Sequence, residues 1–112
     1  MDWHELRSEA QVDEITEGSA SIPVLIFKHS TRCSISAMAL SRFERQWNNG
    51  GGEIKPFFLD LLKFRNVSDY ISSKFKVQHE SPQVLVITGG TCVYHAAHNA
   101  IDVDDVFEQI NN

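Results

Sequence analysis

A continuous apolar run at residues 24–27, Val-Leu-Ile-Phe, constrains the fold of this chain more than any other feature. Four successive apolar residues predict a strand that is covered on both faces, because a strand with one wet face alternates apolar and polar side chains. Pro23 precedes the run and polar residues follow it, so the predicted strand is short. Strands of this kind lie at the centre of α/β sheets, with helices on both sides.

Helical patterns lie on either side of this central strand. Ser8 is expected to cap a first helix, because Gln11 follows three residues later and completes a capping box. A second helix is expected to begin near Cys33, and the run Asn-Asn-Gly-Gly-Gly at residues 48–52 is its predicted stop signal. The central strand is therefore expected to connect two helices.

The second half of the chain continues the alternation and ends with a hairpin and a helix. Either Asn66 or Ser68 is expected to cap a third helix. Gly89-Gly90 is the expected two-residue hairpin turn. The expected elements are strands over 3–6, 24–27, within 53–62, over 83–88 and over 91–96, and helices over 8–18, from 33 to before 48, after 66 or 68, and from 102.

Three strand-helix units followed by a hairpin and a closing helix resemble the element order of a thioredoxin-like fold. We therefore expect an α/β protein with a central mixed β-sheet flanked by helices, forming one thioredoxin-like domain over residues 1–112. The length of 112 residues and the hydrophobic fraction of 42% agree with a single core of this size.

Charge and cysteine content narrow the classes of partner. The net charge of −5 argues against binding to nucleic acid or to an anionic membrane surface, since phosphate contacts need clustered Lys and Arg. No stretch approaches the ~20 apolar residues of a membrane span, and the first residues lack a signal-peptide pattern, so the cytoplasm is the expected location. The two cysteines and five histidines show no metal-ligand spacing, and no metal is expected.

Cys33 is the candidate reactive residue. It stands at a predicted strand-to-helix junction, where unpaired N–H groups and the helix dipole favour an anion, and Arg32 adds a neighbouring cation. Such placement typically lowers a cysteine pKa below its reference of ~8.5. The alternative is a small buried apolar residue, which the polar neighbours of Cys33 disfavour.

Position 36, where a Cys-x-x-Cys motif would have its second thiol, is a serine. A mixed disulfide at Cys33 therefore has no resolving thiol at Ser36 and must wait for an external one. Cys92 is not expected to replace it, because the predicted strand over 83–88 spans roughly 20 Å at ~3.3 Å per residue before the chain turns.

Two segments are similar to signatures of a known family. The segment FKHSTRCSIS resembles the active-site segment FKHST-x-CPIS of the YtxJ-like monothiol bacilliredoxins, and VQHESPQVLVI resembles that family's second signature. Trp3, Val67-Ser68 and the segment HAAHNAI extend the likeness over nearly the whole chain. The resemblance implies a thioredoxin fold in which Cys33 is the nucleophile and Pro82 is a cis-proline that faces it.

The chain departs from the family pattern at two places. Ser34 stands where the family usually has proline, which leaves an additional N–H and hydroxyl near the sulfur. Asn99-Ala100 replaces an aromatic-containing pair after His98, a change that bears on recognition of the small thiol.

Other polar residues have candidate supporting roles. Thr31, Arg32, Ser34 and Ser36 are expected to form the active-site loop or to support the thiolate, and Ser81, Pro82 and His98 are expected to line the substrate groove. His98 is either a contact to the bound thiol or a solvated loop residue. His29 either bonds the neighbouring turn or tunes the thiolate, and His79 with Glu80 is expected to shape the loop before Ser81.

The expected function is that of a monothiol thiol-disulfide oxidoreductase, which removes a low-molecular-weight thiol from client cysteines through a mixed disulfide on Cys33. The resemblance implies bacillithiol as this cosubstrate, S-thiolated proteins as partners and no tightly bound cofactor. Two alternatives stay open. One is a noncatalytic thioredoxin-like stress or binding protein, and the other is a glutaredoxin-like or peroxidase-like enzyme that uses another small thiol or peroxide.

Overall fold

A computed structural model describes residues 1–47 and 53–111 of the chain. The elements in chain order are β1 (His4–Glu5), α1 (Glu9–Gly18), β2 (Val24–His29), α2 (Ser34–Gln46), β3 (Lys55–Asp60), α3 (Arg65–Phe75), β4 (Gln83–Thr88), β5 (Thr91–Ala97), the 3-10 turn η2 (His98–Ala100) and α4 (Val103–Asn111). This is the order expected from the sequence. The predicted stop signal at residues 48–52 lies outside the described residues.

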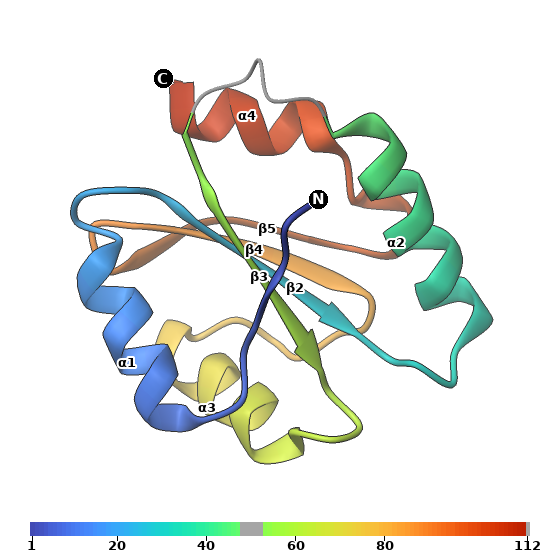
Figure 1. Cartoon of the computed structure of the whole chain (residues 1–112), viewed down its shortest axis with the longest axis horizontal. Helices are drawn as coiled ribbons and strands as arrows, with labels where there is room; N and C mark the ends of the chain where they lie inside the picture. The colour runs from blue at the N-terminus through green and yellow to red at the C-terminus, as the bar shows by residue number, and fades with distance from the viewer. Residues whose placement is uncertain (48–52, 112) are drawn as a thin grey trace.

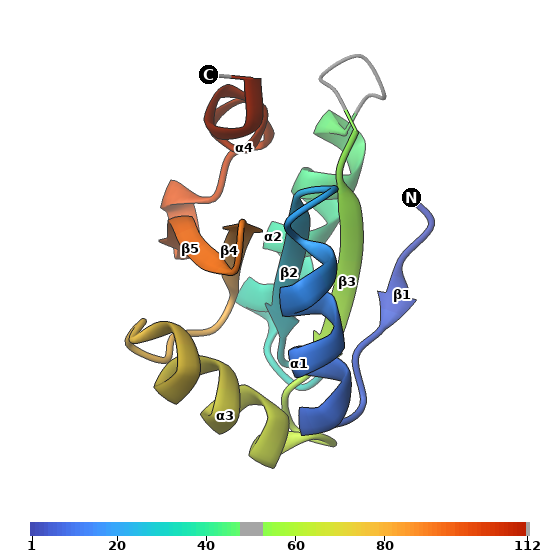
Figure 2. The same cartoon turned by 90° about the vertical axis from the view of Figure 1, so that its left-hand side faces the viewer.

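The five strands within residues 1–47 and 53–111 form one mixed sheet in the order β1-β3-β2-β4-β5, so the predicted central strand is central. β3 is parallel to both β1 and β2, whereas β4 is antiparallel to β2 and β5. Helices α1 and α3 cover one face of the sheet, and α2 and α4 cover the other (Figures 1 and 2). The predicted α/β architecture with a thioredoxin-like fold is confirmed.

Each face of β2 contributes to a separate apolar core. Val24 and Ile26 pack with the α1 and α3 side, and Leu25 and Phe27 pack with the α2 and α4 side. Side chains of successive strand residues point to opposite faces, which explains why the whole run is apolar. None of the helices in the described ranges is long and apolar enough to cross a membrane.

Local signals position the elements as expected at two places. The Ser8 hydroxyl accepts the N–H of Gln11 at 3.1 Å and caps α1. Gly89 and Gly90 form the turn between β4 and β5 with φ angles of 60° and 80°, which is the positive region that a two-residue hairpin turn requires.

The predicted start of α3 is wrong. The helix begins at Arg65, with Phe64 at the N-cap, so neither Asn66 nor Ser68 caps it. The Asp60 carboxylate instead accepts the N–H groups of Leu62 and Lys63 in the turn before the helix. Ser68 is buried inside the helix.

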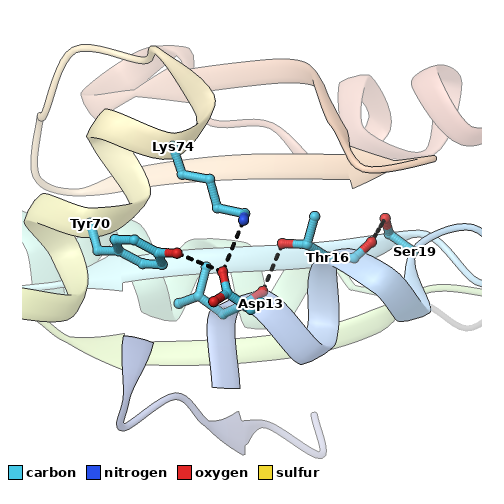
Figure 3. Close-up of polar contacts among 6 residues, drawn as sticks. Asp13, Thr16, Ser19, Tyr70 and Lys74 are labelled. Carbon is cyan, nitrogen blue, oxygen red and sulfur yellow. Dashed lines mark hydrogen bonds and ion pairs between the residues drawn. The ribbon is translucent and has the colours of Figure 1, made fainter. Parts of the chain in front are cut away.

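A polar contact joins α1 to α3 on the face that these helices share (Figure 3). The Asp13 carboxylate accepts a hydrogen bond of 2.6 Å from the Tyr70 hydroxyl and one of 2.9 Å from the Lys74 ammonium. These bonds hold the pKa of Asp13 below its ordinary value, the Tyr70 hydroxyl being the larger cause. The contact therefore stabilises the packing of two helices that are far apart in sequence.

Candidate active site

Cys33 is the N-cap residue of α2, at the carboxyl end of the central strand. Its N–H donates to the Ser30 carbonyl at 3.1 Å, which closes a turn, and its carbonyl accepts the N–H of Ala37 at 3.0 Å. The side chain is half-buried. Cys33 therefore lies at the end of α2 where the first N–H groups have no partner within the helix and carry the positive end of its dipole.

The loop residues next to Cys33 face solvent. Thr31, Arg32 and Ser34 are exposed. Ser34, which stands where the related family has proline, is the first residue of α2. The first helical position tolerates proline, so the helix begins at the same place with either residue.

Ser36 is fully buried, in contrast to its neighbours in the loop. Its hydroxyl oxygen accepts the N–H of Ser30 at 3.1 Å and lies 2.7 Å from Nδ1 of His29. Burial lowers the pKa of His29, and the carboxylates of Asp60 and Glu44 oppose this shift. The Ser36 hydroxyl thus connects the first turn of α2 to His29 and Ser30, at the start of the turn that carries Cys33. Of the two roles that the sequence left open for His29, the structure shows the bond to the neighbouring turn.

The Ser81–Pro82 segment lies at the same end of the sheet as Cys33. Gln83 pairs with Lys28 in the antiparallel register, so residues 81 and 82 lie beyond the carboxyl end of β2, where the chain turns toward Cys33. The Ser81–Pro82 peptide bond is cis. Among residues 1–47 and 53–111, the buried Oγ of Ser81 has no hydrogen-bond partner.

His98 returns to this end of the sheet, as its place after the last strand predicted. Its N–H donates to the Pro82 carbonyl at 3.1 Å, and its side chain is 53% exposed, with Nε2 4.0 Å from a carboxylate oxygen of Glu80. The Arg42 guanidinium donates to the carbonyls of His98 and Ile101 at 3.4 and 3.3 Å, which ties α2 to this loop. Cys33, Pro82 and His98 therefore belong to three loops that meet at the same end of the sheet.

Cys92 is remote from this end of the sheet. It pairs with Ile87 near the opposite end of β4 from Gln83. Its thiol is half-buried and donates to the Tyr94 carbonyl at 3.3 Å, and burial raises its pKa. Both cysteines are free thiols in the part of the chain that the structure describes, and the register agrees with the expectation that Cys92 does not reach Cys33.

The sequence analysis missed a buried polar cluster beside the site. Lys28 is 0% exposed, and its Nζ lies 3.1 Å from the Ser72 hydroxyl, 3.4 Å from the Ser68 carbonyl and 3.5 Å from Nδ1 of His79. Burial lowers the pKa of Lys28 to about 8, with Asp69 opposing the shift. The signal that could have indicated it is a lysine directly after four apolar strand residues.

Two observations separate this site from other features of the surface. A hollow of about 840 Å³ between α1 and the β1–β3 edge, lined by residues that include Glu5, Glu14 and Lys55, contains none of the candidate residues. Within the described ranges, no three His, Cys, Asp or Glu side chains gather into a group able to hold a metal ion. The candidate site is therefore identified by its chemistry and not by its depth.

Comparison with known proteins agrees with this geometry. The model of the monothiol bacilliredoxin BrxC family matches residues 4–106. A solved structure described as a candidate oxidoreductase with a thioredoxin fold is 30% identical, with a TM-score of 0.81, over 95% of this chain and 91% of that one.

More distant structures share the fold alone. Thioredoxin from Malassezia sympodialis is 14% identical, with a TM-score of 0.74 over 98% of this chain and 89% of its own. Oxidised thioredoxin O2 from Arabidopsis thaliana is 15% identical, with a TM-score of 0.73 over 98% of this chain and 95% of its own.

Proposed function

The chain belongs to the monothiol bacilliredoxin family, and on this premise we propose that it removes a low-molecular-weight thiol, bacillithiol, from the cysteines of client proteins. Family and fold support the broader class of thiol oxidoreductase. The observation that carries the finer proposal is the arrangement at α2: a cysteine at the helix N-cap, and at the resolving position a buried serine already bonded to His29 and Ser30.

The proposed reaction consists of two thiol-disulfide exchanges. The Cys33 thiolate attacks the bacillithiol sulfur of the mixed disulfide on the client, forms a new disulfide with it, and releases the client cysteine as a thiolate. A second small thiol, as its thiolate, then attacks the bacillithiol sulfur of the capped Cys33, forms a small-molecule disulfide with it and releases Cys33 as a thiolate. The disulfide bond is conserved in each exchange, so the reaction needs no resident cofactor.

The groove residues have proposed roles in the first exchange. Backbone groups at Ser81 and Pro82 are suited to hold an extended client segment in a strand-like contact, and the exposed His98 side chain is suited to contact the small thiol. Thr31, Arg32 and Ser34 are exposed beside Cys33 in the chain, and their proposed role is to support the thiolate, with Arg32 supplying positive charge. We place the reaction in the cytoplasm, where cysteines are kept reduced.

The test uses a client peptide with a single cysteine capped by bacillithiol. The Cys92→Ser variant is expected to take the cap as fast as the wild type, with the added mass on Cys33, whereas Cys33→Ser is expected to take none. Cap removal by Cys33→Ser at the wild-type rate would refute the proposal.

The same assay separates the alternatives. A peptide capped by glutathione and a peroxide are offered in parallel. Faster transfer from the glutathione cap than from the bacillithiol cap identifies a glutaredoxin-like enzyme. Oxidation of Cys33 by peroxide, with no transfer from either cap, identifies a peroxidase-like one. No modification of Cys33 by any of the three indicates a noncatalytic binding protein.

A further inference from the structure

Two buried polar residues interrupt the apolar face of the sheet directly behind the Pro82 loop. Lys28 of β2 and Gln83 of β4 are paired in the antiparallel register, and both are 0% exposed. Val24 and Ile26, which precede Lys28 on the same face of β2, are apolar core residues. The change from apolar to polar thus occurs at one level of the sheet, the level next to the candidate site.

Both side chains bind the segment Gln78-His79, one at its backbone and the other at a side chain. Gln83 Nε2 donates to the Gln78 carbonyl at 3.0 Å, and Lys28 Nζ lies 3.5 Å from Nδ1 of His79. The Ser68 hydroxyl of α3 lies 3.1 Å from the same His79 nitrogen. Residues 78 and 79 are therefore attached to β2, β4 and α3, and they lead within three residues to Ser81 and Pro82.

The hydrogen-bond chemistry fixes the protonation of His79. The Lys28 ammonium has donors only, so Nδ1 of His79 accepts from it, and the proton of the neutral ring lies on Nε2. The pKa of His79 is lowered, first by burial and then by the cations Lys28 and Arg65, while Asp69 and Glu80 oppose the shift. A neutral His79 is thus the acceptor that the buried ammonium needs.

A requirement for folding alone does not explain this cluster. Burying an ammonium is costly even when it is hydrogen-bonded, and an apolar side chain of similar volume often gives equal or greater stability at such a position. Residues that break the local packing rule without a gain in stability are expected at functional sites. The polar cluster connects the strand that leads to Cys33 with the loop that carries Pro82.

We propose that Lys28 is a positioning residue that, through His79, sets the place of the Ser81–Pro82 loop relative to Cys33 and so controls the entry of the client peptide. The role in client transfer rests on the proposed function. The sulfur itself is not contacted by this cluster in the described residues, so small reagents that attack Cys33 without using the groove are insensitive to it.

The experiment compares Lys28→Met with Ile26→Met, which puts the same side chain on the same face of β2, two residues farther from the site. Three quantities are measured for each full-length variant: transfer from the bacillithiol-capped peptide, alkylation of Cys33 by iodoacetamide, and amide hydrogen exchange. For Lys28→Met, transfer is expected to fall about tenfold or more while alkylation stays within about twofold of wild type. The His98 N–H donates to the Pro82 carbonyl at 3.1 Å, so its exchange reports on the loop and is expected to rise about tenfold, with no such rise at α4. Ile26→Met is expected to change neither rate by more than about twofold.

His79 gives an independent check of the same link. His79→Asn keeps an acceptor near the position of Nδ1 and is expected to retain most of the transfer rate, whereas His79→Leu removes the acceptor and is expected to resemble Lys28→Met. Unchanged hydrogen exchange of the His98 N–H in Lys28→Met would overturn the attachment of the loop. Unchanged transfer, or a parallel fall in alkylation, would overturn the positioning role. If the wild type itself transfers no cap while the exchange result holds, the proposed function fails and the attachment of the loop stands.

Discussion

Lys28 and His29 are consecutive residues of β2 whose side chains bond on opposite faces of the sheet, Lys28 to His79 in the loop before Pro82 and His29 to Ser36 in the first turn of α2. One dipeptide thereby attaches two of the three loops of the candidate site, those of Cys33 and Pro82, to the central strand. Adjacent strand residues point to opposite faces of the sheet, so two consecutive positions can bind one loop on each face.

The Ser36 hydroxyl is expected to contribute measurably to stability. Ser36→Ala leaves the buried Nδ1 of His29 and the N–H of Ser30 without this partner, a loss of about 1–3 kcal/mol in the free energy of unfolding. Urea denaturation measures it. Ser41→Ala, at an exposed position on the same helix, is the control and is expected to change stability by less than about 0.5 kcal/mol. Equal stability of the two variants would contradict the role assigned to the bond.

A thiol at position 36 is expected to convert the monothiol site into a dithiol site that can form its own disulfide. The side chains of an N-cap residue and of the residue three positions later lie close enough to interact, so Ser36→Cys is expected to form a disulfide with Cys33 on mild oxidation. Mass spectrometry detects the loss of two hydrogens within one peptide. The Cys92→Ser background removes the other thiol, and persistence of two free thiols under oxidation would show that the buried side chain cannot turn toward Cys33.

The lowered pKa of Lys28 predicts the direction in which folding stability changes at alkaline pH. Its pKa in the folded protein is about 8, below the ordinary 10.5, so the unfolded chain binds more protons between these values and the contribution of Lys28 to folding stability increases as the pH rises through the interval. The free energy of unfolding of wild type minus that of Lys28→Met is expected to increase by up to roughly 3 kcal/mol between about pH 7.5 and about pH 10. A difference that stays constant over this range would mean that the ammonium is not desolvated.

Asp13 makes the opposite test in acid. Its pKa is lowered by Tyr70 and Lys74, so its contribution to stability is complete above the ordinary value of 3.8 and is lost as the pH falls through the lowered pKa. Asp13→Asn is expected to be less stable than wild type at about pH 6 and to approach it at about pH 2. Urea midpoints across this range measure the effect, and Glu14→Gln on the same helix serves as the control. A gap between Asp13→Asn and wild type that persists in strong acid would assign the effect to shape and not to charge.

Local signals in the sequence were sufficient for most of the fold. Ser8 caps its helix because its partner, Gln11, is three residues away, and Gly89-Gly90 forms the hairpin because the turn itself requires positive φ. The start of α3 was missed because the polar residues Asn66 and Ser68 fit the capping preference, whereas Phe64 at the true N-cap makes no side-chain cap and the preceding turn is held by the Asp60 carboxylate. The helix start near Cys33 and the cis bond before Pro82, which the family resemblance implied, both agree with the structure.

The buried bonds of the site could not be predicted in the same way. The apolar run ends at Phe27, yet β2 continues through Lys28 and His29, and both are buried. The partners of Lys28 are 40 to 51 residues away in sequence, so no local window shows that its charge is accommodated. Ser36 was expected to support the active-site loop, but its pairing with His29 requires the geometry of the turn between them.

The position of the two free thiols at opposite ends of the sheet has a practical use. Cys92 is half-buried with a raised pKa, and it lies at the end of the sheet away from the three loops. A fluorescent or paramagnetic reporter attached under neutral conditions is therefore expected to react first at Cys33, in the native chain and without any engineered cysteine. Docking of a peptide at the groove then becomes observable by spectroscopy from the labelled sulfur itself.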